Sequence, residues 1–149
     1  MNLDMAKIQA NVEPPRIPQP IPVPEEYRII ADWRSTLREF FAASKNILKH
    51  HNVTSMQYQA LVAIRTSEEP EGINMNGLAS YLGVRHNSAV GLVNRLQTQG
   101  LVERLRSDRD RRVAHLRLTE AGESCLKELV QAHSAALMDI RTEIRRIFK

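Results

Sequence analysis

Arginine is concentrated in one segment of the sequence, between Arg85 and Arg117. This segment holds eight arginines and three acidic residues, so its net charge is +5, whereas the whole 149-residue chain has a net charge of +4. The guanidinium group presents a planar fork of donors that can bond phosphates and guanine edges in a bidentate way. Positive charge confined to this segment therefore favours a polyanionic partner that offers phosphates.

The residues from His86 to Gln99 have the spacing of an amphipathic helix. Apolar side chains three and four residues apart form a narrow stripe that would face a core: Ala89, Leu92, Val93 and Leu96. Polar side chains that can bond base edges and phosphates lie outside this stripe, mostly at the N-terminal end: Arg85, His86, Asn87, Ser88, Asn94 and Arg95. Gly91, on the same outer face, would allow close approach of a DNA backbone. We therefore predict a recognition helix here.

A short polar segment, 107–112, separates two strand-like runs at 101–106 and 113–118. This pattern predicts a β-hairpin with a charged tip. The tip residues expected to take part in binding are Arg109, Asp110, Arg111 and Arg112. Arginine is favoured in a narrow minor groove by the negative potential there. Residues two apart on an extended strand share a face, so we expect the carboxylate of Asp110 to bind and orient the guanidinium of Arg112. Alone, such a tip is usually solvated surface, but its position after the polar helix favours a DNA-binding wing.

The elements that would position these residues can be read from helical spacing, caps and turns. We expect helices from Glu25 to about His51, from a capping box at Thr54, from Met75 to Leu82 before Gly83, over 86–99, and after Thr119 with a break or bend near Ser134. The third and fourth helices with their tight turn make a helix-turn-helix. The predicted fold class is mainly α with a small β-hairpin wing. It comprises a winged helix-turn-helix lobe (53–119) and a helical dimerisation lobe (25–52 and 120–149).

Residues 1–24 form a proline-rich arm with six of the seven prolines of the chain. Proline lacks a backbone N–H and restricts the residue before it, so this arm cannot be helical. An extended, polyproline-like segment is expected. The sequence leaves open whether it is a loosely ordered tail or an arm that packs across a dimer partner.

The segment from about Val53 to Gly122 resembles the MarR (multiple-antibiotic-resistance regulator) family of winged helix-turn-helix transcription regulators. The resemblance is carried by four motifs in this order: GLVNRL (91–96), GLVER (100–104), DRR (110–112) and LRLTEAG (116–122). It implies a homodimeric repressor that binds a palindromic operator, with 85–95 as recognition-helix positions and Arg112 in the minor groove. It also implies dimer contacts from the first and last helices, for which we expect Trp33, Phe40, Ile140, Ile144 and Ile147.

This chain departs from the usual family pattern at three positions of the recognition helix. Arg85 stands where serine is common, Asn87 where proline or a hydroxyl residue often follows, and Asn94 where aspartate is usual. The fold is expected to be unaffected by these changes. The operator sequence and the regulated genes are not predictable from them.

The resemblance further implies a small aromatic effector, bound in a cleft lined by the first, second and fifth helices. The expected lining is Trp33, Phe40, Phe41, His50, His51 and Tyr58. The alternative is that these side chains are ordinary core and surface residues and that no ligand binds there. Some relatives sense oxidants through a cysteine of the first helix, whereas this chain has only Cys125, so a redox-sensing regulator that uses Cys125 is an alternative. An inert thiol on an apolar face is the simpler interpretation.

Other function classes find little support. The sequence contains no G-x-S-x-G, P-loop or H-E-x-x-H motif and no zinc-ligand spacing, so we expect no enzyme activity, no cofactor and no metal site. It has no apolar run long enough to span a membrane and no signal-peptide pattern. We therefore expect a bacterial cytoplasmic, nucleoid-associated protein with no membrane partner. A winged helix that serves as a protein-interaction module is the remaining alternative.

Overall fold

A computed structural model describes residues 21–107, 110 and 112–148 of the chain. Its elements, in chain order, are α1 (Glu25–His50), α2 (Ser55–Thr66), α3 (Met75–Leu82), α4 (His86–Thr98), β1 (Val102–Arg106), β2 (Ala114–Leu118) and α5 (Glu120–Ile147). The predicted fold class, mainly α with a small antiparallel hairpin, is confirmed. Most of the proline-rich arm lies outside the described residues, and residues 21–24 are exposed and not helical.

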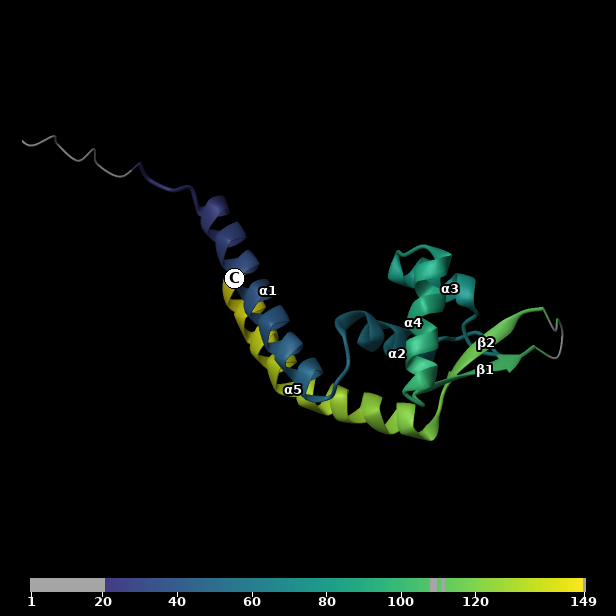
Figure 1. Ribbon diagram of the computed structural model, residues 1–149. Coiled ribbons are helices and arrows are strands. Elements are labelled where there is room, and N and C mark those ends of the chain that lie inside the picture. Colours follow the sequence, from purple (N-terminus) through teal and green to yellow (C-terminus); the bar gives the residue numbers. More distant parts are fainter. Residues whose placement is uncertain (1–20, 108–109, 111, 149) are drawn as a thin grey trace, which may run out of the picture.

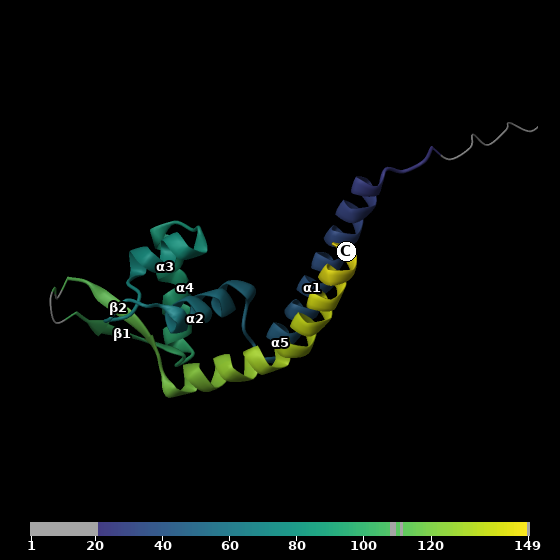
Figure 2. The same ribbon diagram turned by 180° about the vertical axis from the view of Figure 1, so that it is seen from behind.

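The molecule has two lobes that share helix α5. One lobe contains α2, α3, α4 and the hairpin, and in the other α1 runs beside the second part of α5 (Figure 1). The view from behind shows the same arrangement (Figure 2). Within the described residues, no helix has both the length and the apolar character that a bilayer crossing requires.

The predicted helix starts follow from side chains that satisfy free backbone N–H groups. In the capping box of α2, Gln57 N donates to Thr54 Oγ1 at 3.2 Å and Thr54 N donates to Gln57 Oε1 at 2.8 Å. At the start of α5, Gly122 N donates to Thr119 Oγ1 at 3.0 Å. Both caps were expected from the sequence and are confirmed. The two caps thus fix the residues at which α2 and α5 begin, on either side of the segment that contains α3, α4 and the hairpin.

The core of this lobe draws one large leucine from each of five elements. The fully buried leucines are Leu61, Leu78, Leu96, Leu116 and Leu129, from α2, α3, α4, β2 and α5. The predicted apolar stripe of α4 is also confirmed, because Ala89, Leu92, Val93 and Leu96 are all buried. Burial of this stripe fixes the rotation of α4 and turns its polar face outward.

Helix α5 is unbroken from Glu120 to Ile147, so it does not end at Ser134, although it curves along its length (Figure 1). His133 of this helix is only 2% exposed and joins the two lobes. Its Nε2 lies 2.9 Å from Ser44 Oγ of α1, and its ring stacks on Tyr58 of α2 at a centroid distance of 4.9 Å. Burial at this junction raises the pKa of Tyr58.

Candidate DNA-binding surface

The turn between α3 and α4 is short because Gly83 adopts a left-handed conformation, with φ 65° and ψ 31°. Its N–H reaches the carbonyl of Ser80, and Val84 N donates to Ala79 O at 3.0 Å, which closes the end of α3. Helix α4 then begins after Arg85, whose side chain makes no capping bond. The first N–H groups of α4 are therefore left without a side-chain cap, as an anion-binding helix start requires.

All six residues predicted for the recognition helix are exposed, on α4 or directly before its first residue. They are Arg85, His86, Asn87, Ser88, Asn94 and Arg95. The Nδ1 atom of His86 lies 2.8 Å from Asn76 Oδ1, and this contact ties the ring to α3. A Cβ added at Gly91 would meet nothing within 4 Å, so the chain itself leaves this face open.

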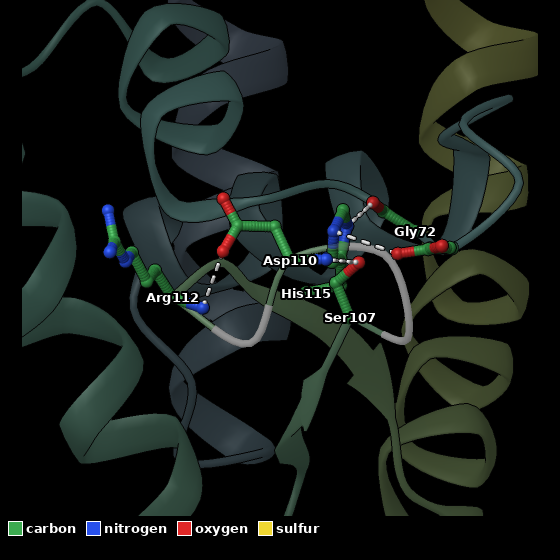
Figure 3. A network of polar contacts seen from close by, with 6 residues as sticks. Gly72, Ser107, Asp110, Arg112 and His115 are labelled. Atoms are coloured by element: carbon green, nitrogen blue, oxygen red, sulfur yellow. Dashed lines mark hydrogen bonds and ion pairs between the residues drawn. The ribbon is translucent and has the colours of Figure 1, made fainter.

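The hairpin tip is held by hydrogen bonds centred on Asp110. Asp110 N donates to Ser107 Oγ at 3.2 Å, and Val113 N donates to Asp110 O at 3.0 Å. Asp110 Oδ1 accepts from the backbone N–H of Arg112 at 2.9 Å (Figure 3). Arg109 and Arg111 lie outside the described residues.

The expectation that Asp110 binds the guanidinium of Arg112 is wrong. The hydrogen bond from Val113 N to Asp110 O is that of a turn rather than of an extended strand, and in such turns an aspartate side chain bonds the main chain two residues further on. The Arg112 side chain points away from this carboxylate (Figure 3). Asp110 therefore shapes the tip, while the guanidinium of Arg112 stays available for another anion.

Strand β2 of the hairpin is docked on the loop between α2 and α3. The Nδ1 atom of His115 lies 2.6 Å from Gly72 O, and its Nε2 lies 3.3 Å from Glu71 Oε2. Leu116 N donates to Ile73 O at 2.8 Å. Gly72 has φ +89°, and a Cβ there would lie 2.8 Å from Leu116 O, so only glycine suits this close approach. The sequence reasoning missed this contact, because nothing local marks a partner 43 residues away.

Between α4 and the hairpin lies a groove of about 320 Å³. Its polar lining comes from three regions: Asn74 and Asn76 at the start of α3, His86 of α4, and Arg104 and Arg112 of the hairpin. His86 and Arg112, predicted separately for the helix and the wing, thus meet in one concave surface. Asn74, Asn76 and Arg104 were not predicted as site residues. Two guanidinium groups and a helix start facing one groove suit the phosphate backbone of a nucleic acid.

This arrangement matches known proteins. The model of the MarR family matches residues 51–113. The transcriptional repressor MprA of Escherichia coli (strain K12) is 33% identical over 84 residues, which are 56% of this chain and 47% of MprA. The structure of CouR from Rhodococcus jostii RHA1 bound to p-coumaroyl-CoA is similar with a TM-score of 0.58 and 30% identity, over 66% of this chain and 67% of CouR. The chain belongs to the MarR family.

The winged-helix architecture of this MarR-family chain also appears in a DNA-bound structure. A single-residue mutant of S. aureus MepR bound to an oligodeoxyribonucleotide has a TM-score of 0.66 at 16% identity, over 81% of this chain and 84% of that one. At this identity the likeness concerns the fold. The chain spans about half the length of the curated relatives it matches, with 47% of MprA as the example above.

The residues predicted to line an effector cleft in this MarR-family chain are not brought together. Trp33 packs on Phe148 at a ring-centroid distance of 5.8 Å, and Phe40 packs on Phe41 at 5.6 Å. Tyr58 stacks on His133. The Nδ1 atom of His50 forms a hydrogen bond with the carbonyl oxygen of Asn46, and the Nδ1 atom of His51 lies 3.7 Å from Glu128 Oε2. A pocket of about 550 Å³ lies instead where α1 meets the α1–α2 loop, and of the six residues only Phe41 lines it.

The residues predicted for dimer contacts lie along the internal contact between α1 and α5. Trp33, Phe40, Ile140, Ile144 and Ile147 are all half-buried within the single chain. Other large apolar side chains of the same two helices are exposed: Tyr27, Ile30, Phe41, Val130, Leu137 and Met138. The helical lobe thus retains an apolar surface after α1 and α5 have packed together.

Cys125 is half-buried near the start of α5. Burial raises the pKa of its thiol, and the nearby charge of Glu128 raises it further. A higher pKa lowers the thiolate fraction at neutral pH, and the thiolate is the reactive species. This environment gives no support to a redox sensor at Cys125. Within the described residues, no three histidine, cysteine or acidic side chains are grouped to hold a metal ion.

Proposed function

We propose that this MarR-family chain is a sequence-specific, double-stranded-DNA-binding transcription regulator that acts as a homodimeric repressor at a palindromic operator. The observation that carries the proposal is the groove in which the open start of α4 and the guanidinium of Arg112 face the same space. A helix placed in the major groove with a wing arginine in the adjacent minor groove would use both features. The MepR structure, which has the same fold and is bound to an oligodeoxyribonucleotide, supports DNA binding by this fold.

A footprint on DNA that flanks the chain's own gene tests the proposal. We expect a protected palindrome whose half-sites are about one helical turn apart, since two recognition helices related by a two-fold axis contact successive major grooves. Arg112→Ala should weaken operator binding by roughly 1–3 kcal/mol if the side chain is inserted in a groove. Unchanged affinity of this variant would remove the wing from the mechanism.

Two further measurements complete this test. Arg65→Ala is the matched control, because Arg65 pairs with Glu123 at 3.0 Å and does not line the groove. This variant should bind like the wild type. The salt dependence of binding separates the proposal from a protein-interaction module, because release of counterions from phosphates gives a steep decrease of affinity with salt. Absence of any duplex binding at low salt would favour the interaction module.

We infer that the pocket at the α1–α2 corner holds the effector, and that the effector is an organic anion with an apolar body. The pocket wall is apolar at Phe41, Leu48 and Val53, while Lys45 and Lys49 supply positive charge. Such a combination suits a ligand that buries a ring or chain and pairs its anionic group. The complex of the relative CouR with p-coumaroyl-CoA supports this ligand class.

Calorimetry with benzoate, p-coumarate and p-coumaroyl-CoA tests this effector proposal. We expect at least one of these anions to bind, and Lys45→Gln with Lys49→Gln to weaken its binding at least severalfold. The double variant Lys127→Gln with Arg141→Gln removes two exposed positive charges of α5 that do not line the pocket, and should leave binding unchanged. Equal binding by the pocket variant, or no binding of any of the three anions, would contradict the proposal.

A further inference from the structure

Arg104 of β1 is bonded to the recognition helix. Its Nη2 donates to Asn94 Oδ1 of α4 at 2.7 Å. Residues directly opposite on an antiparallel pair share a face, and Arg104 lies opposite the buried Leu116. The side chain therefore leaves the strand on the side that faces α4. Asn94 holds the guanidinium at the point where wing and helix meet.

The positive charge of Arg104 has no ionic partner among the described residues. Its bonded neighbour Asn94 is neutral, and no side-chain interaction of Arg104 other than this bond is present within that part of the chain. Arg65 and Arg146, in contrast, pair with Glu123 and Glu143 at 3.0 and 2.8 Å. A guanidinium has five N–H donors, so one bond to an amide oxygen leaves most of them free.

Arg104 also has the position that a phosphate contact requires. It is exposed, and it lines the groove together with His86 and Arg112. It therefore stands between the helix that would enter the major groove and the wing that would reach the minor groove. The sugar–phosphate backbone that separates the two grooves would pass this point.

We propose that Arg104 is a phosphate-binding residue and that Asn94 is the residue that positions it, rather than a reader of base edges. This inference rests on the proposed function and revises the role expected for Asn94. A neutral amide serves this purpose better than a carboxylate would, because it orients the guanidinium and leaves its full charge for the phosphate.

The test is the affinity of the full chain for a fluorescein-labelled random-sequence 30-base-pair duplex, measured by anisotropy over a series of salt concentrations. Arg104→Gln should reduce the steepness of the slope of log affinity against log salt by about 0.9 for each phosphate contact that is lost. At 0.1 M salt this change corresponds to a roughly eightfold loss of affinity per contact. Arg104→Lys keeps the charge and should retain the slope. Arg65→Gln, which lies outside the groove, should match the wild type.

A double-mutant cycle tests the role of Asn94. Asn94→Ala should raise the dissociation constant in the wild-type background and have no further effect in Arg104→Gln, because it acts through that side chain. A full additive effect would show that Asn94 contacts DNA by itself, and would overturn its positioning role. If the Arg104→Gln variant binds with the affinity of the wild type and with the same dependence on salt, the proposed phosphate contact is overturned. No binding by the wild type at low salt would instead reject the proposed function.

Discussion

Two glycines occupy helical positions with opposite surroundings. At Gly122, in the first turn of α5, an added Cβ would overlap the carbonyl group of Leu101, whereas at Gly91 of α4 it would meet nothing within 4 Å. Glycine is therefore required by the internal packing at Gly122. The chain's own packing gives no such reason at Gly91, where glycine costs helix stability relative to alanine.

We expect Gly122→Ala to destabilise the fold by roughly 1–3 kcal/mol, because either α5 or the segment at Leu101 must move. Gly91→Ala should stabilise it by about 0.5–1 kcal/mol, since alanine is the better helix former. Urea denaturation of both variants measures these changes. If Gly91 serves the approach of a DNA backbone, Gly91→Ala should also bind the operator more weakly than wild type. A stable Gly91→Ala protein with full affinity would show that this glycine has no part in DNA binding.

The thiol of Cys125 should react slowly. Since burial and the charge of Glu128 raise its pKa, the thiolate population at pH 7.5 should be below that of an unfolded chain and should increase only at higher pH. The rate of reaction with a thiol reagent, native against urea-unfolded, measures this difference. A native rate above the unfolded one would revive the redox-sensing alternative.

At the scale of elements, the parts that the sequence predicted well are those whose cause is local. The stripe of α4, the capping box at Thr54 and the turn at Gly83 each depend on residues within one or two helical turns. Contacts between distant elements, such as that of His115 with Gly72, leave no such pattern. For the same reason the six residues predicted for the effector cleft do not line one pocket, because periodicity predicts which face of a helix is buried but not which helix covers it.

The hairpin tip shows how a local pattern can mislead. Alternation along a strand placed Asp110 and Arg112 on one face, but the chain turns at this point and the carboxylate bonds the backbone. Asp110→Ala should therefore weaken DNA binding by about 0.5–1.5 kcal/mol through loss of this bond. Asp110→Asn keeps an acceptor oxygen and removes a negative charge, so its affinity should equal or exceed that of wild type. Equal losses in both variants, in an anisotropy assay with the operator, would favour the guanidinium contact instead.

At the scale of the whole molecule, the exposed apolar side chains of the helical lobe support the proposed dimer. Leu137 and Met138 are 48% and 58% exposed on the part of α5 that also carries the internal contact with α1. Apolar side chains gathered on one surface favour association, because burying them removes apolar area from water.

Leu137→Glu combined with Met138→Glu should convert the dimer to monomers, because a charge buried at an apolar interface is costly. Light scattering after size exclusion measures the mass, and the melting temperature of the wild type should rise with protein concentration. Tyr81→Glu, at an exposed aromatic residue of α3 in the other lobe, is the matched control and should stay dimeric. A monomeric wild type at micromolar concentration, or a dimeric Leu137→Glu/Met138→Glu variant, would exclude this interface.

The continuity of α5 has a mechanical consequence. Only Thr119 separates β2 from this helix, whose other end belongs to the lobe proposed to associate. Its 28 residues extend over about 42 Å at the usual rise, so a 10° change of curvature at mid-length would displace one end by roughly 4 Å. That displacement is about the rise of one base pair, roughly 3.4 Å. A ligand that straightens α5 slightly would change the spacing between the two recognition helices of the proposed dimer. That spacing would then no longer match the helical repeat of the DNA.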